Sequence, residues 1–157
     1  MAISLHPVTP DFVAEVGDVE LGKTLALEDL AAIRAAFAKY AVLIFPDQEF
    51  TDESQLDFAR NFGPLETTVF KARKNHELRL HENMADVSNL DSKNRILGTN
   101  DRQRLYNLGN RLWHTDSSFK RLPAFCSMLH ARSIPPIGGH TEFADMRAAY
   151  DALPEKT

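Results

Sequence analysis

The sequence has little cysteine, no long apolar run and no marked excess of one charge. Cys126 is the only cysteine among 157 residues, so the chain cannot form an internal disulfide, and a reducing, cytoplasmic location is expected. No run of about 18 apolar residues predicts a membrane-spanning helix, and no secretory signal pattern opens the chain. The formal net charge of -4 is mild, and no block of like charge indicates nucleic acid or a membrane as partner.

The composition and the spacing of apolar residues predict a folded domain whose first part is rich in helices. Hydrophobic residues make up 43% and charged residues 25%, as in folded globular domains. Residues 26–40 carry apolar side chains every three or four positions, which predicts an amphipathic helix. The apolar run 41–45 predicts a short buried strand. A second helix is expected to begin at Thr51, a suitable N-cap, and to stop at Gly63.

The remainder of the chain is expected to be richer in strands, which makes the fold class α+β. A polar stretch, 91–111, predicts a long loop. A last helix is expected over 146–153, capped by Asp145. Short strands are expected in four places: 67–70, 85–90, 125–134 and 140–144.

The most informative residues for chemistry are His114 and Asp116. On an extended strand, side chains two positions apart point to the same face from roots about 7 Å apart. An imidazole and a carboxylate can converge from there on one metal ion, with bonds of about 2.0–2.2 Å. They would supply two ligands of a 2-His-1-carboxylate iron(II) site. The spacing alone fits equally well a strand-end histidine that hydrogen-bonds a nearby aspartate.

Four segments in a fixed order extend this signal over nearly the whole chain. They are residues 42–48, 58–66, 113–119 and 134–153. Together they resemble the taurine dioxygenase / 2,4-dichlorophenoxyacetate dioxygenase family, most closely its phenoxyacetate-cleaving branch. The resemblance implies a double-stranded β-helix, or jelly roll, with flanking helices. Residues 1–157 would be the N-terminal part of one such dioxygenase domain, with the C-terminal part of the jelly roll absent.

The resemblance assigns roles to five residues. His114 and Asp116 match the first two iron ligands, and Thr141 matches a threonine that hydrogen-bonds the 2-oxoglutarate carboxylate. Asn110 matches a polar residue of the substrate pocket, and Lys71 lies where a cation would meet the substrate carboxylate. Each of the last three also has an ordinary explanation: a strand threonine, an asparagine that satisfies loop backbone, and a solvated surface lysine.

The sequence departs from the family in two respects. His140 occupies a position that is usually acidic in close relatives, and it is expected to face away from the site because Thr141, its neighbour on a predicted strand, faces toward it. The family's third ligand, a histidine, and the arginine that grips 2-oxoglutarate have no counterpart after Asp116. The 157-residue chain alone is therefore expected to be inactive and prone to aggregation.

The resemblance implies an iron(II)- and 2-oxoglutarate-dependent dioxygenase that uses O2 and a small anionic organic substrate. The expected substrate is an aryloxyalkanoate such as 2,4-dichlorophenoxyacetate, cleaved to a phenol and glyoxylate, with succinate and CO2 as co-products. Two alternatives stay open: the same chemistry on a sulfonate such as taurine, and an inactive truncated fragment. No nucleic-acid or membrane partner is expected, and assembly into a homo-oligomer is left open.

Overall fold

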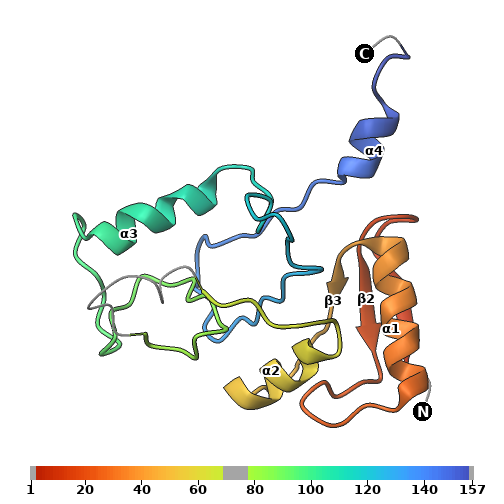
Figure 1. Cartoon of the computed structure of the whole chain (residues 1–157), viewed down its shortest axis with the longest axis horizontal. Coiled ribbons are helices and arrows are strands. Elements are labelled where there is room, and N and C mark those ends of the chain that lie inside the picture. Colours follow the sequence, from red (N-terminus) through yellow and green to blue (C-terminus); the bar gives the residue numbers. More distant parts are fainter. Residues whose placement is uncertain (1–2, 69–77, 156–157) are drawn as a thin grey trace. The chain divides into compact units, whose positions relative to one another are not determined.

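The computed structural model describes residues 3–68 and 78–155. Their helices and strands, drawn in Figure 1, belong to two compact units. The first unit comprises Met1–Phe50 and Leu129–Thr157, and the second comprises Thr51–Met128. Within the described ranges, no helix combines the length and the apolar composition that crossing a bilayer requires.

A three-stranded sheet lies in the first unit. β1 (Ser4–Pro7) pairs antiparallel with β2 (Ala14–Gly17), and β2 pairs in parallel with β3 (Leu43–Ile44). In β2 the side chains of Ala14 and Val16 are buried, and the residue between them is exposed. This alternation places one face of the sheet on the core and the other in solvent.

The helix α1 (Leu27–Tyr40) connects β2 to β3 and runs alongside them in Figure 1. Its buried side chains, Ile33, Ala36 and Tyr40, lie three or four residues apart, and two of them pack with Ala14 of β2. A crossover of this kind is what two parallel strands require, because a tight turn cannot join them. The amphipathic helix predicted for this segment is therefore confirmed.

The strand β3 is shorter and less buried than predicted. Only two residues of the predicted segment 41–45 pair with β2, and the side chain of Ile44 is 45% exposed. Among the described strands none pairs with the other edge of β3, so that edge is open. The predicted strand is confirmed in position, but its predicted burial is wrong because it is an edge strand here.

The helix α4 (Met146–Asp151) is anchored to the end of α1 by Arg147. Asp145 caps α4, since its side chain accepts hydrogen bonds from two backbone N–H groups of the first turn. The Arg147 guanidinium donates to the carbonyl of Lys39 at 2.8 Å and to that of Asp11 at 3.0 Å. A cation at carbonyls that end a helix is a favourable arrangement. The predicted helix and its cap are confirmed.

The second unit opens with α2 (Asp52–Arg60), whose start is fixed by a capping box. The Thr51 side chain accepts a hydrogen bond from the backbone N–H of Ser54, and the Ser54 hydroxyl accepts one from the backbone N–H of Thr51. Two donors that a helix start leaves unsatisfied are thereby paired. The predicted N-cap at Thr51 is confirmed.

Replacement of Thr51 by alanine is expected to lower the free energy of unfolding by about 1 kcal/mol, the usual effect of losing a threonine N-cap. Urea unfolding of the full-length protein, followed by far-ultraviolet circular dichroism, measures the change. Thr24→Ala is the matched control, because Thr24 is exposed and caps no helix. Equal losses in the two variants would show that the cap does not stabilise α2.

The long loop predicted for residues 91–111 is wrong in part. It contains α3 (Arg102–Asn107) and the 3-10 helix η2 (Leu108–Arg111). The Asp101 side chain accepts a hydrogen bond from the backbone N–H of Gln103 and begins α3. A short capped helix of mostly polar residues carries no apolar stripe, which is why the sequence pattern indicates a loop.

The strands predicted beyond residue 66 do not form ladders in the described parts of the chain. In the segment 85–90 only Leu90 pairs, through an isolated bridge to Ile96. The segments 125–134 and 140–144 run without strand pairing, and 67–70 lies partly outside the described residues. A strand is stabilised by a ladder of paired residues, and within the described residues the segments 85–90, 125–134 and 140–144 form none. These three strand predictions are wrong, whereas the prediction for 67–70 stays a prediction because residues 69 and 70 lie outside the described residues.

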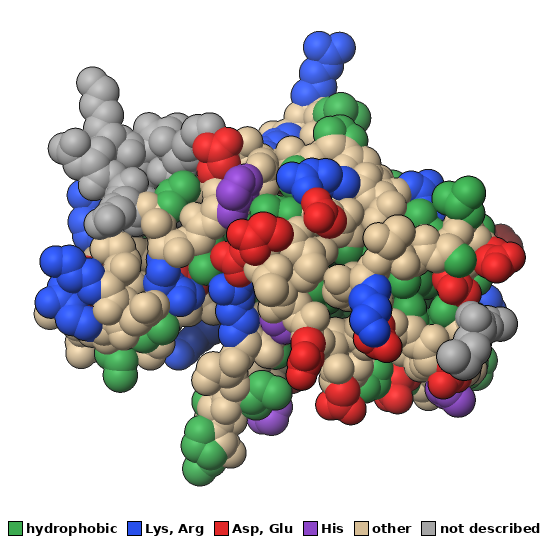
Figure 2. Space-filling model, turned by 90° about the horizontal axis from the view of Figure 1, so that it is seen from below, with side chains coloured by type: hydrophobic (Ala, Val, Ile, Leu, Met, Phe, Trp, Pro, Cys, Tyr) green, Lys and Arg blue, Asp and Glu red, His purple; other side chains and the backbone are tan. Residues whose placement is uncertain are grey.

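Many large apolar side chains consequently stay exposed in both units. Figure 2 shows apolar side chains between interspersed acidic and basic groups on the face in view. Exposed apolar surface of this extent is an aggregation hazard. Examples are Trp113, Phe119 and Leu122 in the second unit, and Ile134, Ile137 and Tyr150 in the first.

Candidate metal-binding site

The segment with His114 and Asp116 is a turn, not the predicted strand. After η2 the chain runs through residues 113–115 without strand pairing, and a turn begins at Asp116. Ser117 has a φ of 56°, in the left-handed region, which reverses the chain direction. The strand prediction is therefore wrong, but the two side chains still lie on the same side of the backbone.

The Nε2 atom of His114 lies 3.4 Å from the Oδ1 atom of Asp116. This distance is longer than a good N–H···O hydrogen bond, which spans about 2.7–3.2 Å. It suits two ligands of one ion, because atoms about 2.0–2.2 Å from a shared metal at angles of about 90–110° lie roughly 3.0–3.5 Å apart. Both side chains are about half exposed, at 49% and 61%, so an ion could reach them.

The outer atom of each side chain is held by the protein. The Nδ1 atom of His114 lies 2.7 Å from the backbone carbonyl of Leu112, so it carries the ring proton and donates it there. In a neutral ring, this tautomer leaves the Nε2 lone pair facing Asp116. The Oδ2 atom of Asp116 accepts a hydrogen bond from the Ser127 hydroxyl at 2.7 Å, which leaves Oδ1 facing the imidazole. One nitrogen and one oxygen thus remain for a metal.

The turn that carries Asp116 is bound to Glu66. The Glu66 carboxylate accepts a hydrogen bond from the Ser117 hydroxyl at 2.7 Å and forms an ion pair with Lys120 at 2.9 Å. The hydrogen bond from Lys120, followed by that from Ser117, holds the pKa of the Glu66 carboxyl below its usual value. Neither Ser127 nor Glu66 is among the site residues predicted from sequence, because both partnerships depend on contacts distant along the chain.

The other predicted site residues are dispersed. Asn110 lies in η2 of the second unit with its side chain exposed. Thr141 and His140 lie in the first unit, outside any strand, and both are exposed. Lys71 lies outside the described residues. Within the described ranges, no cluster of three or more histidine, cysteine, aspartate or glutamate side chains is present, so the pair stands without a third ligand there.

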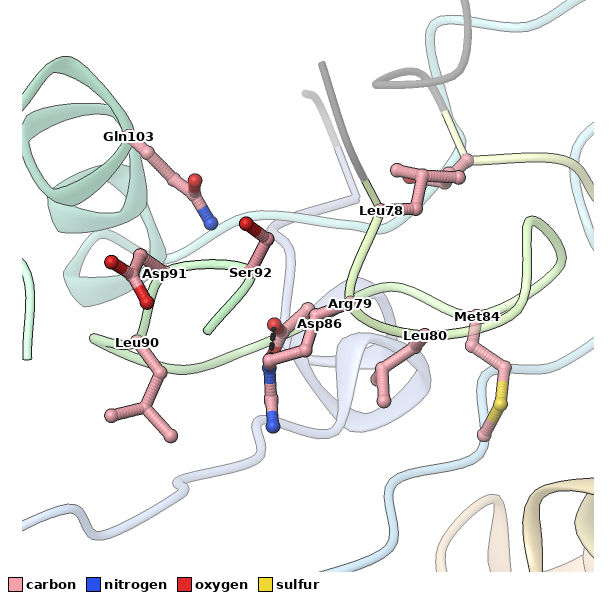
Figure 3. Close-up of a pocket in the computed structure, with 10 residues that line it drawn as sticks. Leu78, Arg79, Leu80, Met84, Asp86, Leu90, Asp91, Ser92 and Gln103 are labelled. Carbon is pink, nitrogen blue, oxygen red and sulfur yellow. Dashed lines mark hydrogen bonds and ion pairs between the residues drawn. The ribbon is translucent and has the colours of Figure 1, made fainter. Parts of the chain in front are cut away.

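A separate pocket in the second unit does not include this pair. Figure 3 shows Arg79 directed at Asp86 in the pocket, with Leu80, Leu90 and Gln103 among its lining residues. Its volume of about 30 Å³ has room for water molecules only. It is therefore a packing defect around an ion pair and too small for an organic substrate.

An imidazole nitrogen and a carboxylate oxygen, each oriented by a second hydrogen bond and open to solvent, are the donors found in mononuclear iron(II) oxygenases. The comparison with known proteins points to the same class. Residues 4–157 match the family described as taurine catabolism dioxygenase TauD, TfdA, and the chain belongs to this family.

Two individual relatives show which members of the family the chain is similar to. The chain is 40% identical over 154 residues to an alpha-ketoglutarate-dependent 2,4-dichlorophenoxyacetate dioxygenase of Cupriavidus pinatubonensis, covering 98% of this chain and 54% of the relative. It is 39% identical over 158 residues to an (S)-phenoxypropionate/alpha-ketoglutarate-dioxygenase of Sphingobium herbicidovorans, covering 98% and 49%. The chain thus spans about half the length of the curated relatives it matches.

A solved structure supports the same relationship. The crystal structure of AAD-2 in complex with Mn(II) and N-oxalylglycine superposes with a TM-score of 0.86 at 44% sequence identity. The match covers 99% of this chain and 51% of that one. This match supports the family assignment and the α+β fold class of the described residues.

Proposed function

We propose that the full-length protein is an iron(II)- and 2-oxoglutarate-dependent dioxygenase that hydroxylates a small carboxylate, and that an aryloxyalkanoate is its substrate class. The observation that carries the proposal is the pair of facing atoms, Nε2 of His114 and Oδ1 of Asp116, 3.4 Å apart. The relatives named for 2,4-dichlorophenoxyacetate and (S)-phenoxypropionate support the substrate class.

In this proposal His114 and Asp116 hold the iron through Nε2 and Oδ1. Bound iron and 2-oxoglutarate supply the oxidising chemistry, in which O2 and 2-oxoglutarate yield succinate, CO2 and a hydroxylated substrate. The Leu112 carbonyl keeps the imidazole in the tautomer that can ligate, and Ser127 keeps the second carboxylate oxygen of Asp116 occupied. Removing rotational freedom from both ligands in advance favours binding, because less entropy is lost when the ion arrives.

The other proposed roles concern the two organic molecules. Thr141 donates a hydrogen bond to a carboxylate of 2-oxoglutarate, and Asn110 lines the substrate pocket. Lys71 pairs with the substrate carboxylate and so places the carbon beside the ether oxygen toward the iron. Hydroxylation of that carbon gives a hemiacetal, which collapses to a phenol and glyoxylate. Taurine is the second candidate substrate, because the family description includes taurine catabolism.

The test uses the full-length protein without oxygen. Addition of Fe(II) and 2-oxoglutarate should produce a visible metal-to-ligand charge-transfer band. Addition of O2 should then form succinate in amounts that depend on the substrate, with 2,4-dichlorophenoxyacetate above taurine. Absence of the band would defeat the enzyme proposal, whereas a band with greater succinate formation on taurine would replace the substrate class only.

Replacement of Lys71 by alanine is expected to raise KM for aryloxyalkanoates about 10- to 100-fold, because one charge-assisted hydrogen bond contributes about 1.5–3 kcal/mol. Iron and 2-oxoglutarate binding should stay unchanged. Steady-state succinate formation measures the effect. Lys23→Ala is the matched control, since Lys23 pairs only with the exposed Glu20. An unchanged KM in the Lys71 variant would remove Lys71 from the substrate site.

A further inference from the structure

The turn after Asp116 holds a conformation that its own residues do not favour. Ser117 has a φ of 56°, and the left-handed region costs a non-glycine residue about 1–2 kcal/mol. Such a conformation persists only where surrounding contacts enforce it. The direction of the Asp116 side chain depends on this backbone, since Asp116 is the residue immediately before it.

A single carboxylate oxygen binds both ends of the turn. The Oε2 atom of Glu66 accepts a hydrogen bond from the Ser117 hydroxyl at 2.7 Å and lies 2.9 Å from the Lys120 ammonium. The backbone N–H of Lys120 donates to the Ser117 carbonyl at 2.9 Å, which closes the turn. The side chains of Lys120 and Glu66 are only 31% and 33% exposed, so solvent weakens this contact less than a surface ion pair.

The backbone around Glu66 has hydrogen bonds of its own. The backbone carbonyl of Glu66 accepts a hydrogen bond from the Asn83 side chain at 2.9 Å, and the backbone N–H of Thr68 donates to the Glu82 carbonyl at 2.8 Å. These two bonds join residues 66–68 to residues 82–83. The backbone that carries the Glu66 side chain is therefore held independently of the turn at Ser117.

We infer that Glu66 is a positioning residue for the metal ligand Asp116. Its carboxylate fixes the turn of residues 116–120 through Ser117 and Lys120, and the turn directs Oδ1 of Asp116 at Nε2 of His114. Glu66 is not assigned as a third ligand, because among the described residues no three histidine, cysteine, aspartate or glutamate side chains lie close enough to hold one ion. The inference rests on the proposed function, since it assigns to Asp116 the role of an iron ligand.

The experiment measures Co(II) affinity of the full-length protein by visible absorbance titration, together with the melting temperature of the metal-free form. Glu66→Gln should lower Co(II) affinity roughly 3- to 10-fold, less than the about 10- to 100-fold loss typical of a direct hydrogen-bond partner of a ligand. Lys120→Met should lower it by a similar factor, and Lys120→Arg, which keeps the cation, should restore it to within about twofold of wild type.

The matched control is Glu20→Gln, which removes a carboxylate from another lysine pair and should leave Co(II) affinity unchanged. Ser117→Ala supplies a second test should the Glu66 variant fail to fold. The double variant of Glu66 and Ser117 should weaken Co(II) binding by less than the product of the two single factors, because both changes act on the one network of Glu66, Ser117 and Lys120.

The outcomes distinguish a failure of the proposed function from a failure of the positioning role of Glu66. Wild-type protein that does not bind Co(II) or Fe(II) would overturn the proposed function and, with it, the role given to Asp116. Wild-type protein that binds Co(II), with Glu66→Gln and Ser117→Ala within twofold of it, would overturn the positioning role alone. A lower melting temperature with unchanged Co(II) affinity would show that Glu66 stabilises the fold only.

Discussion

Replacement of Asp116 by alanine is expected to lower the affinity of the full-length protein for Fe(II) by more than about 100-fold, beyond the loss typical of an outer partner of a metal ligand. The change removes one of the two proposed iron ligands, and with it the negative charge that would offset the charge of the ion. Anaerobic titration with Fe(II) in the presence of 2-oxoglutarate measures it, since the charge-transfer band should disappear at metal concentrations that saturate wild type.

A control variant and a variant of intermediate effect accompany the Asp116 measurement. Asp57→Ala is the matched control, because Asp57 is an exposed aspartate of α2 that pairs with Arg60. Ser127→Ala should weaken Fe(II) binding by an intermediate factor of about 10, because it frees Oδ2 of Asp116 without removing a ligand. An Asp116→Ala protein that binds Fe(II) as wild type does would show that the pair with His114 is only an ion pair.

Replacement of Arg79 by methionine is expected to lower the free energy of unfolding by about 2–3 kcal/mol. Arg79 donates to both carboxylate oxygens of Asp86, at 2.7 Å and 2.6 Å, and to the side chain of Asn94 at 3.2 Å. The side chains of Arg79 and Asp86 are 20% and 18% exposed, so the change removes the arginine from a mostly buried carboxylate. Breaking a fully buried pair costs about 3–5 kcal/mol, and partial exposure reduces that figure. Urea unfolding measures the loss.

The control for this variant is Arg60→Met, which breaks the exposed pair with Asp57 and should cost less than about 1 kcal/mol. Hydrogen exchange should localise the Arg79 effect, with faster exchange over residues 86–94 than in α1. Equal losses in the two arginine variants would contradict the view that the Arg79 pair orders this part of the second unit.

The helices α1, α2 and α4 could be predicted because their signals are local. The apolar stripe of α1, the Thr51 capping box of α2 and the Asp145 cap of α4 each act within a few residues of the chain. Apart from the position of β3, the strands could not be predicted, because a strand depends on partners that lie anywhere in the sequence. The same limit explains why the two short strands β1 and β2, joined by an irregular connection, are absent from the predictions.

The same difference between local and distant contacts applies to the candidate site. His114 and Asp116 are two positions apart, so their convergence could be predicted even though the predicted strand is wrong. Ser127 is 11 residues from its partner and Glu66 is 51, and no spacing rule connects them. The roles of Thr141, Asn110 and Lys71 come from family resemblance and stay predictions. No contact within the described residues ties Thr141 or Asn110 to the pair, and Lys71 lies outside those residues.

Two features of the structure restrict which amino acid can occupy position 117. The position needs a hydroxyl for Glu66, and it needs a side chain that tolerates positive φ. Threonine would keep the hydroxyl, but its branched β-carbon disfavours the backbone shape, while glycine would accept the shape and lose the hydroxyl. Serine meets both requirements in part, and exchanges that look conservative by chemical class would be poorly tolerated at this position beside Asp116.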